Sequence, residues 1–213
     1  MSLRTWIAML FFTAVLTPAL ARAADRLAEA AARGDLASAK RLLQAGGNAN
    51  ARDQDGWTSL MRAAKGGNVA MVQLLREAGA DVNASAPNRW TALMLATYEG
   101  HVRVADYLIE AGANVDARND IDAPPVMIAA FRGWRAILQR LLRAGADVNA
   151  RKNDRGTALI WAAHEGHAVI VGDLIAAGAD VNARKHAGES ALSYANTNGH
   201  TTIAEMLRRA GAR

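Results

Sequence analysis

The chain has 213 residues, 51% of them hydrophobic, and a formal net charge of +5 at pH 7. This length and apolar content suffice for one domain with a sizeable core. The absence of cysteine excludes disulfides and a lipid-modified cysteine, and the charge is too mild to indicate a nucleic-acid partner.

Residues 1–23 have the features of a secretory signal peptide. Arg4 supplies a short positive start, and residues 6–16 form an almost unbroken apolar run. The tripeptides that end at Ala21 and at Ala23 both fit the small-x-small rule, so we expect cleavage after one of them. The apolar run is shorter than the roughly 20 residues that cross a bilayer. We therefore expect no stable membrane insertion; an uncleaved N-terminal anchor is the alternative.

The predicted export also indicates a compartment. Cleavage would remove Arg4 and Arg22 and lower the net charge from +5 to +3. A chain without cysteine suits an oxidising compartment, because it has no thiol to mispair. The short signal and the alanine-rich composition are typical of bacteria. We expect the protein in the periplasm, with release from the cell as the second choice.

The rest of the chain repeats itself every 33 residues. A fixed period of this size is typical of a solenoid, in which each unit buries its apolar face against its neighbours. The shorter first and last copies carry polar residues that suit end caps. We expect one repeat domain over residues 24–213. Its parts are an N-terminal cap at 25–52, full repeats at 53–85, 86–118, 119–151 and 152–184, and a C-terminal cap at 185–213.

Each copy predicts two helices, as the copy at 86–118 illustrates. Thr91 precedes an apolar run and can cap the free N–H groups of a first helix that ends at Gly100. A second amphipathic helix follows and ends at Gly112. The tail after it contains Asn and Asp, which can hydrogen-bond their own backbone and hold a turn into the next copy.

The repeated sequence motifs resemble those of the ankyrin repeat family. They are G-x-T-x-L at Gly56–Leu60, G-A-D-V-N-A at Gly145–Ala150 and A-A-x-x-G-H at Ala162–His167. The resemblance covers roughly residues 25–213. It implies an all-α ankyrin-repeat solenoid of stacked antiparallel helix pairs with short β-hairpin fingers. It also implies a module that holds a partner protein on its concave side, with the fingertips and the first helices.

The third full copy departs most from this pattern. Pro124 displaces the threonine that would cap its first helix, and Trp134 stands where His101 and His167 stand in neighbouring copies. Either this copy is locally weaker or its irregularity serves a ligand.

Aromatic residues gather at repeat positions that contact partners in the proteins this chain resembles. Counting each copy from its first residue, the fifth and thirteenth positions hold Trp57, Trp90, Tyr98, Phe131 and His164. Trp161 and Tyr194, at the tenth position, border the same predicted face. Aromatic side chains are preferred anchors of protein interfaces. We expect these residues to bind a partner; the alternative is that they merely cover the helix layer.

Basic residues recur where one copy meets the next. The last position of successive copies holds Arg118, Arg151 and Arg184, and Lys152 and Lys185 follow two of them. With repeats stacked about 10 Å apart, these cations would form a ladder along the fingertips. Such a ladder would steer and hold an acidic partner; the alternative is that it only aids solubility.

No catalytic pattern stands out. His164 and His167 are three residues apart with the helix-ending Gly166 between them, whereas a zinc-protease helix needs a spacing of four. We expect no metal or other cofactor. The sequence predicts a monomeric, non-catalytic protein-binding module, acting as an inhibitor or immunity protein or as an enzyme-stabilising scaffold. A secreted effector that binds a host protein is the alternative, and an enzyme is the remote one.

Overall fold

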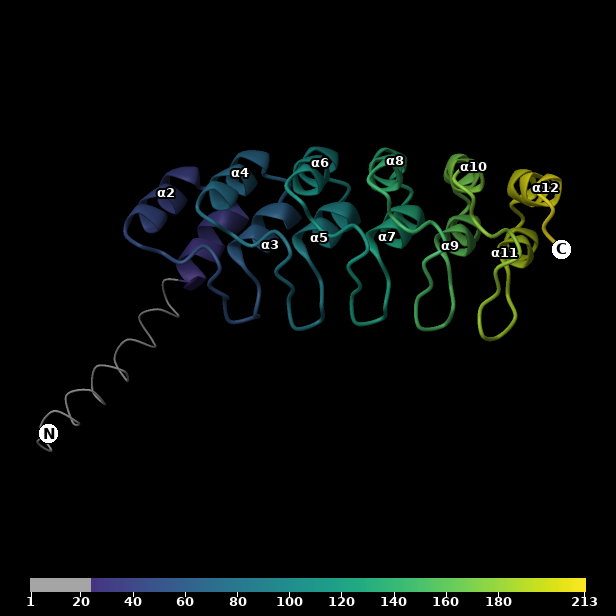
Figure 1. The fold of residues 1–213 in the computed structure, drawn as a ribbon, viewed down its shortest axis with the longest axis horizontal. Coiled ribbons are helices and arrows are strands. Elements are labelled where there is room, and N and C mark those ends of the chain that lie inside the picture. The colour runs from purple at the N-terminus through teal and green to yellow at the C-terminus, as the bar shows by residue number, and fades with distance from the viewer. Residues whose placement is uncertain (1–23) are drawn as a thin grey trace, which may run out of the picture.

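The computed structural model describes residues 24–213, which form two layers of short helices in a linear array (Figure 1). The predicted signal peptide at 1–23 lies outside the described residues. The inner layer contains residues 24–33, α3 (Ser59–Lys65), α5 (Ala92–Glu99), α7 (Pro125–Arg132), α9 (Ala158–Glu165) and α11 (Ala191–Thr197). The outer layer contains α2 (Leu36–Gln44), α4 (Val69–Glu77), α6 (Val102–Glu110), α8 (Arg135–Arg143), α10 (Ala168–Ala176) and α12 (Thr201–Arg209).

The helices pack along two directions. From α3 onward, each inner helix packs against the outer helix of its own pair and against the inner helix of the next pair. Outer helices also pack against their neighbours in the outer layer. The described residues therefore form the expected all-α solenoid, with fingers that project beside the inner layer (Figure 1).

Local caps set the ends of the inner helices. Thr91 accepts a hydrogen bond from the Met94 amide at the start of α5, and Gly100 ends that helix in the left-handed conformation. Both predictions for this copy are confirmed. The hydroxyl cap recurs at Thr58, Thr157 and Ser190. At α7, by contrast, Pro124 occupies the cap position and provides no side-chain hydrogen bond.

The core is a continuous strip between the two layers. The inner helices contribute small side chains, of which Ala129 and Ala130 in α7 are fully buried. The outer helices contribute larger ones at helical spacing, such as Ile137, Leu138 and Leu141 in α8. Because alanine ends at Cβ, neighbouring inner helices can approach closely, and the core runs the length of the array instead of closing on itself.

From the second full copy onward, a ring from each repeat rests on the turn of the preceding one. His101 and His167 donate through Nε2 to carbonyl oxygens 36 residues earlier, at 2.9 and 3.1 Å. Trp134 takes this place in the third full copy, and its Nε1–H donates to the Tyr98 carbonyl at 3.2 Å. The tryptophan that made this copy irregular in sequence therefore keeps the bond between repeats, and at this position the copy is not weakened.

Asparagines in the tails make a second set of bonds between repeats. Asn149, for example, donates from Nδ2 to the Gly178 carbonyl and accepts at Oδ1 from the Asp180 amide. Asn50, Asn83 and Asn182 make the same pair of bonds. Asp116 occupies this position between the second and third full copies. Its side chain has no N–H, so of this pair of bonds it makes only the one from the Asp147 amide, at 3.0 Å.

Asp116→Asn should stabilise the array, because the new Nδ2 can donate to the Gly145 carbonyl as Asn149 donates to Gly178. We expect the free energy of unfolding to rise by about 1 kcal/mol, measured by urea denaturation. The reverse change, Asn149→Asp, should lower it by a similar amount. Two variants that shift stability in the same direction would contradict this role for the ladder.

Gly133→Ala should cost more stability than Gly112→Ala. Both glycines are left-handed, with φ of 81° and 86°, so each alanine carries a backbone penalty of about 1–2 kcal/mol. A Cβ at Gly133 would also lie 2.8 Å from Cε1 of His167, whereas nothing lies within 4 Å of a Cβ at Gly112. Thermal unfolding followed by circular dichroism measures the difference; equal midpoints would show that the ring contact is unimportant.

Candidate protein-binding face

The chain forms a finger between consecutive helix pairs, at residues 52–58, 85–91, 118–124, 151–157 and 184–190 (Figure 1). Antiparallel bridges close three of them: Arg52 with Thr58, Ser85 with Thr91, and Arg184 with Ser190.

The tips of the three middle fingers carry charged residues in an unfavourable backbone conformation. Arg89, Asp122 and Arg155 have φ of 61°, 58° and 65°. For residues other than glycine, this left-handed region costs on the order of 1 kcal/mol or more. Arg89 and Asp122 form an ion pair at 3.1 Å, which links the second and third tips and offsets part of that cost.

A band of aromatic rings lies beside the fingers along the inner helices. This aromatic band comprises Trp57, Trp90, Tyr98, Phe131, Trp161, His164 and Tyr194. Edge-on contacts join many of its members: ring centroids are 5.7 Å apart for Trp90–Tyr98 and Phe131–Trp161, and 4.9 Å for His164–Tyr194. Tyr98 and Phe131 are each 39% exposed. The structure thus brings Trp90 and Tyr98 together as one pair, and Phe131 and His164 into a second group with Trp161 and Tyr194. Among the described residues, no ring contact joins Trp57 to either group.

Two lysines, which we call the lysine pair, flank the C-terminal part of the aromatic band. Lys152 and Lys185 place their Nζ atoms 3.0 and 3.2 Å from the same oxygen, Oδ2 of Asp154. Both ammonium groups also lie over the Trp161 ring, at 5.2 and 5.1 Å from its centroid. The two ammonium groups of the lysine pair therefore share one carboxylate and lie on an aromatic surface that favours cations.

The proton affinities of this cluster reflect competition between burial and pairing. Burial acts to raise the pKa of Asp154, but the Gly156 amide and the two lysines outweigh it and hold that pKa below its ordinary value of 3.8. Burial acts to lower the pKa of Lys185, but Tyr194 and Asp154 outweigh it and raise that pKa. Asp154 and Lys185 are therefore both charged at neutral pH.

The predicted arginine ladder is arranged differently from expectation. The bridge from Arg184 to the capping Ser190 places this arginine at the base of its finger, not at the tip. Arg118 donates from one Nη1 to the carbonyls of Asp122 and Arg151. Arg184 likewise donates to the carbonyls of Gly188 and Arg213. The fingertip placement is therefore wrong, because these guanidinium groups tie each finger to the next part of the chain.

Arg151 differs again, since it forms an ion pair with Asp180 at 3.5 Å. The predicted contact of all three arginines with a partner stays a prediction. Of the cations in the predicted ladder, only the lysine pair lies on the aromatic band.

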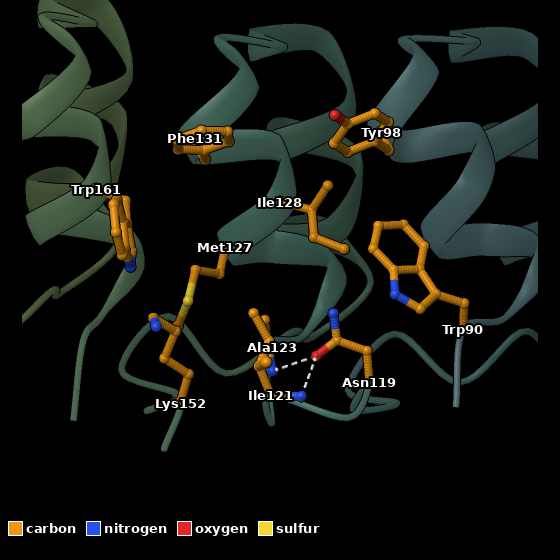
Figure 2. A pocket seen from close by; sticks show the side chains of 10 residues that line it. All are labelled: Trp90, Tyr98, Asn119, Ile121, Ala123, Met127, Ile128, Phe131, Lys152 and Trp161. Atoms are coloured by element: carbon orange, nitrogen blue, oxygen red, sulfur yellow. Dashed lines mark hydrogen bonds between the residues drawn. The ribbon is translucent and has the colours of Figure 1, made fainter. Parts of the chain in front are cut away.

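An apolar pocket opens beside the third finger (Figure 2). It has a volume of about 260 Å³, and its walls include Trp90, Ile128, Phe131 and Trp161, with Lys152 at its edge. We call it the third-finger pocket. Its floor comes from the finger itself, where Ile121 is 48% exposed.

The pocket exists because a large side chain is missing. The fifth position of the first two full copies holds Trp57 and Trp90, but in the next two it holds Ala123 and Gly156. A Cβ at Gly156 would lie 3.1 Å from Nε1 of Trp161, so that indole takes the space in the fourth copy. In the third copy, Ala123 is itself only 5% exposed, but the space beside it stays open as part of the third-finger pocket. This pocket was not predicted, although the change from tryptophan to alanine is a visible signal for it.

Asn119 lies beneath the pocket and was also not predicted. Its Oδ1 accepts hydrogen bonds from the amides of Ile121 and Ala123, at 3.2 and 2.9 Å. These two bonds fix the orientation of the carboxamide, because only its oxygen can accept them. Nδ2 consequently points away from the finger and into the pocket (Figure 2).

The histidines of the His164–His167 segment act separately. His164 Nδ1 lies 2.7 Å from Oε1 of Glu165, and His167 bonds the Phe131 carbonyl. Within residues 24–213, no group of three or more His, Cys, Asp or Glu side chains is placed to hold a metal ion. No helix in that same range is long and apolar enough to cross a membrane.

Comparison with known proteins agrees with the repeat architecture. A family model described as ankyrin repeats (3 copies) matches residues 27–119 and 126–213. None of the curated proteins compared with the chain matches it.

Asp154→Asn should flatten the dependence of stability on pH in acid. Because the folded-state pKa of Asp154 lies below its ordinary value, its ionised form stabilises the fold above about pH 4 and this contribution is lost as pH falls through the folded-state pKa. Urea midpoints between about pH 5 and pH 3 should therefore fall less in the variant. The double variant Lys152→Met, Lys185→Met should have the same effect; slopes equal to that of the unaltered protein would refute the coupling.

Proposed function

The chain belongs to the ankyrin repeat family, and from this premise we propose that it holds a partner protein on the aromatic band and the fingers beside it. Ankyrin repeats are protein–protein interaction modules, and the family is typically non-catalytic. The observation that carries the proposal is the aromatic band itself, in which rings support one another within a repeat, as Trp90 and Tyr98 do, or across neighbouring repeats, as Phe131 and Trp161 do, while Tyr98 and Phe131 stay exposed.

The aromatic band suits a binding surface for an energetic reason. Large aromatic side chains supply much of the affinity in protein interfaces, above all where their conformation is already restricted. Trp90 and Tyr98 restrict each other through their edge-on contact, and Arg132 lies 4.6 Å over the Tyr98 ring. Little side-chain freedom remains to be lost when a partner binds.

The lysine pair indicates that the partner carries negative charge. Lys152 and Lys185 share one Asp154 oxygen, so this part of the surface carries an excess of positive charge. A carboxylate of the partner would be attracted to it, which favours fast association and correct orientation. We therefore propose a partner with an apolar patch beside an acidic one.

We propose that the protein acts in the periplasm as a monomer. The positive start, apolar run and small-x-small tripeptides of residues 1–23 support export, and the lack of cysteine suits an oxidising compartment. The outward side of α12 carries exposed polar residues, such as Thr202, Glu205 and Arg209, which favours an end cap over a subunit contact. In that compartment the protein would inhibit a toxin or hydrolase, or stabilise an enzyme.

Replacing Trp90 and Tyr98 with alanine should abolish partner binding without unfolding the array. Affinity capture from a periplasmic extract with the unaltered protein identifies the partner by mass spectrometry, and titration calorimetry then compares variants. We expect the double variant to lose at least about 2 kcal/mol, or about 30-fold in affinity.

Trp134→His is the matched control. It also removes an indole, but it installs the residue that makes the same bond between repeats at His101 and His167. This control should bind normally. If the Trp90/Tyr98 variant is folded and binds like the control, the proposed surface is wrong.

A further inference from the structure

We propose that the third-finger pocket receives one large aromatic side chain of the partner. The segment that carries this side chain would also supply a carbonyl oxygen to Asn119 and a neighbouring carboxylate to the lysine pair. This inference rests on the proposed function and goes beyond it, since it states which chemical groups of the partner are recognised and where.

The repeat itself indicates the aromatic occupant. In the second full copy, Trp90 from the finger meets Tyr98 from α5 edge-on, with centroids 5.7 Å apart. In the third, Phe131 stands at the position of Tyr98, but Ala123 stands at that of Trp90. The finger side of this pair is therefore missing in the third copy, and Phe131 meets Trp161 of the next copy on its other side. A ring supplied by the partner would meet Phe131 as Trp90 meets Tyr98.

The size and lining of the pocket agree with a side chain. Its volume of about 260 Å³ lies below the roughly 300–1,000 Å³ of pockets that enclose small-molecule ligands. The walls are ring and aliphatic carbon from Trp90, Ile128, Phe131 and Trp161 (Figure 2). An aromatic side chain would remove this apolar surface from water, which is the main favourable contribution to such binding.

Asn119 provides a second, independent observation. The residue is only 2% exposed, and within residues 24–213 its Nδ2 makes no hydrogen bond, although it points into the pocket. Nδ2 is not among the fully buried, unpartnered polar atoms of residues 24–213, so it is open to the pocket, where an incoming carbonyl would accept its hydrogen bond.

Comparison with the first finger shows that this donor has no role in the finger. Asp53 stands at the position of Asn119, and its Oδ1 accepts the same two kinds of bond, from the amides of Asp55 and Trp57. The Asp53 side chain has no N–H, yet its finger forms. The carboxamide Nδ2 is thus dispensable for the turn and is available to a ligand.

Charge at the edge of the pocket indicates the neighbouring group. Lys152 lines the pocket, and its Nζ shares the Asp154 oxygen with Lys185 at 3.0 and 3.2 Å. Arg155, at the tip of the same finger as Lys152, is exposed and forms no ion pair within the described chain. Positive charge in excess of one carboxylate favours an acidic residue next to the aromatic one.

Three capped dipeptides test these requirements separately: acetyl-Trp-Asp-amide, acetyl-Trp-Asn-amide and acetyl-Ala-Asp-amide. They are titrated into ¹⁵N-labelled protein, and the indole and carboxamide N–H signals are followed by NMR. We expect the Trp-Asp peptide to shift the signals of Trp161 and Asn119 but not that of Trp134. The Trp-Asn peptide should bind at least threefold more weakly, and the Ala-Asp peptide should cause no shift.

Two variants place the binding in the pocket. Ala123→Trp fills it with the side chain that the first two copies carry, so the peptide shifts should disappear while the unfolding midpoint stays equal or rises. Asn119→Asp keeps the oxygen that holds the turn, as Asp53 does, and removes the donor; binding should weaken about tenfold. If Ala123→Trp prevents folding, the peptide series and Asn119→Asp still test whether the pocket binds the aromatic side chain.

The outcomes separate this inference from the proposed function. Undiminished peptide binding in folded Ala123→Trp, or no shift at Trp161 and Asn119 in the unaltered protein, overturns the pocket. A captured partner that is lost by the Trp90/Tyr98 variant but retained by Ala123→Trp would leave the binding surface intact and refute only the aromatic occupant. A partner retained by both variants would refute the proposed surface as well.

Discussion

The contact between adjacent repeats is the constraint on which the rest of this molecule depends. Helices of seven to nine residues are too short to be stable alone in water, and one pair cannot bury its own apolar face. Each pair must therefore lie close to the next. Alanines such as Ala129 and Ala130 allow that approach. Rings such as His167, seated over a turn that has no Cβ at Gly133, fix its distance.

A constant distance between repeats gives equivalent positions equivalent surroundings. A residue that differs from those at the same position in the other repeats can then be compared directly with them. Trp134 departs and still makes the bond of the histidines, so its effect is confined to the scaffold. Ala123 departs, and the space that a tryptophan fills in the first two copies is left open as a pocket. The same irregular copy thus contains one change that the scaffold absorbs and one that alters the surface.

The basic residues divide between two roles, one in the scaffold and one on the binding surface. The guanidinium groups of Arg118 and Arg184 donate to backbone carbonyls, where fixed donors stabilise the joints between fingers. The lysine pair cannot satisfy carbonyls in that forked geometry, and it lies instead over Trp161 with a single shared carboxylate. Of the predicted ladder, the cations that lie on the aromatic band are therefore gathered at one place, over Trp161.

The sequence by itself determined the period, the helix ends and the buried positions. Thr91 and Gly100 act through their own backbone, and apolar spacing already specifies which face of a helix is buried. Most of the aromatic band could also be predicted from the sequence, because its residues recur at fixed positions of the repeat. Only the tertiary structure decided the roles of Arg118, Trp134 and Asn119. Whether their donors meet a carbonyl 33 or 36 residues away, or none, depends on how one repeat is placed on the next, and a single repeat does not contain that information.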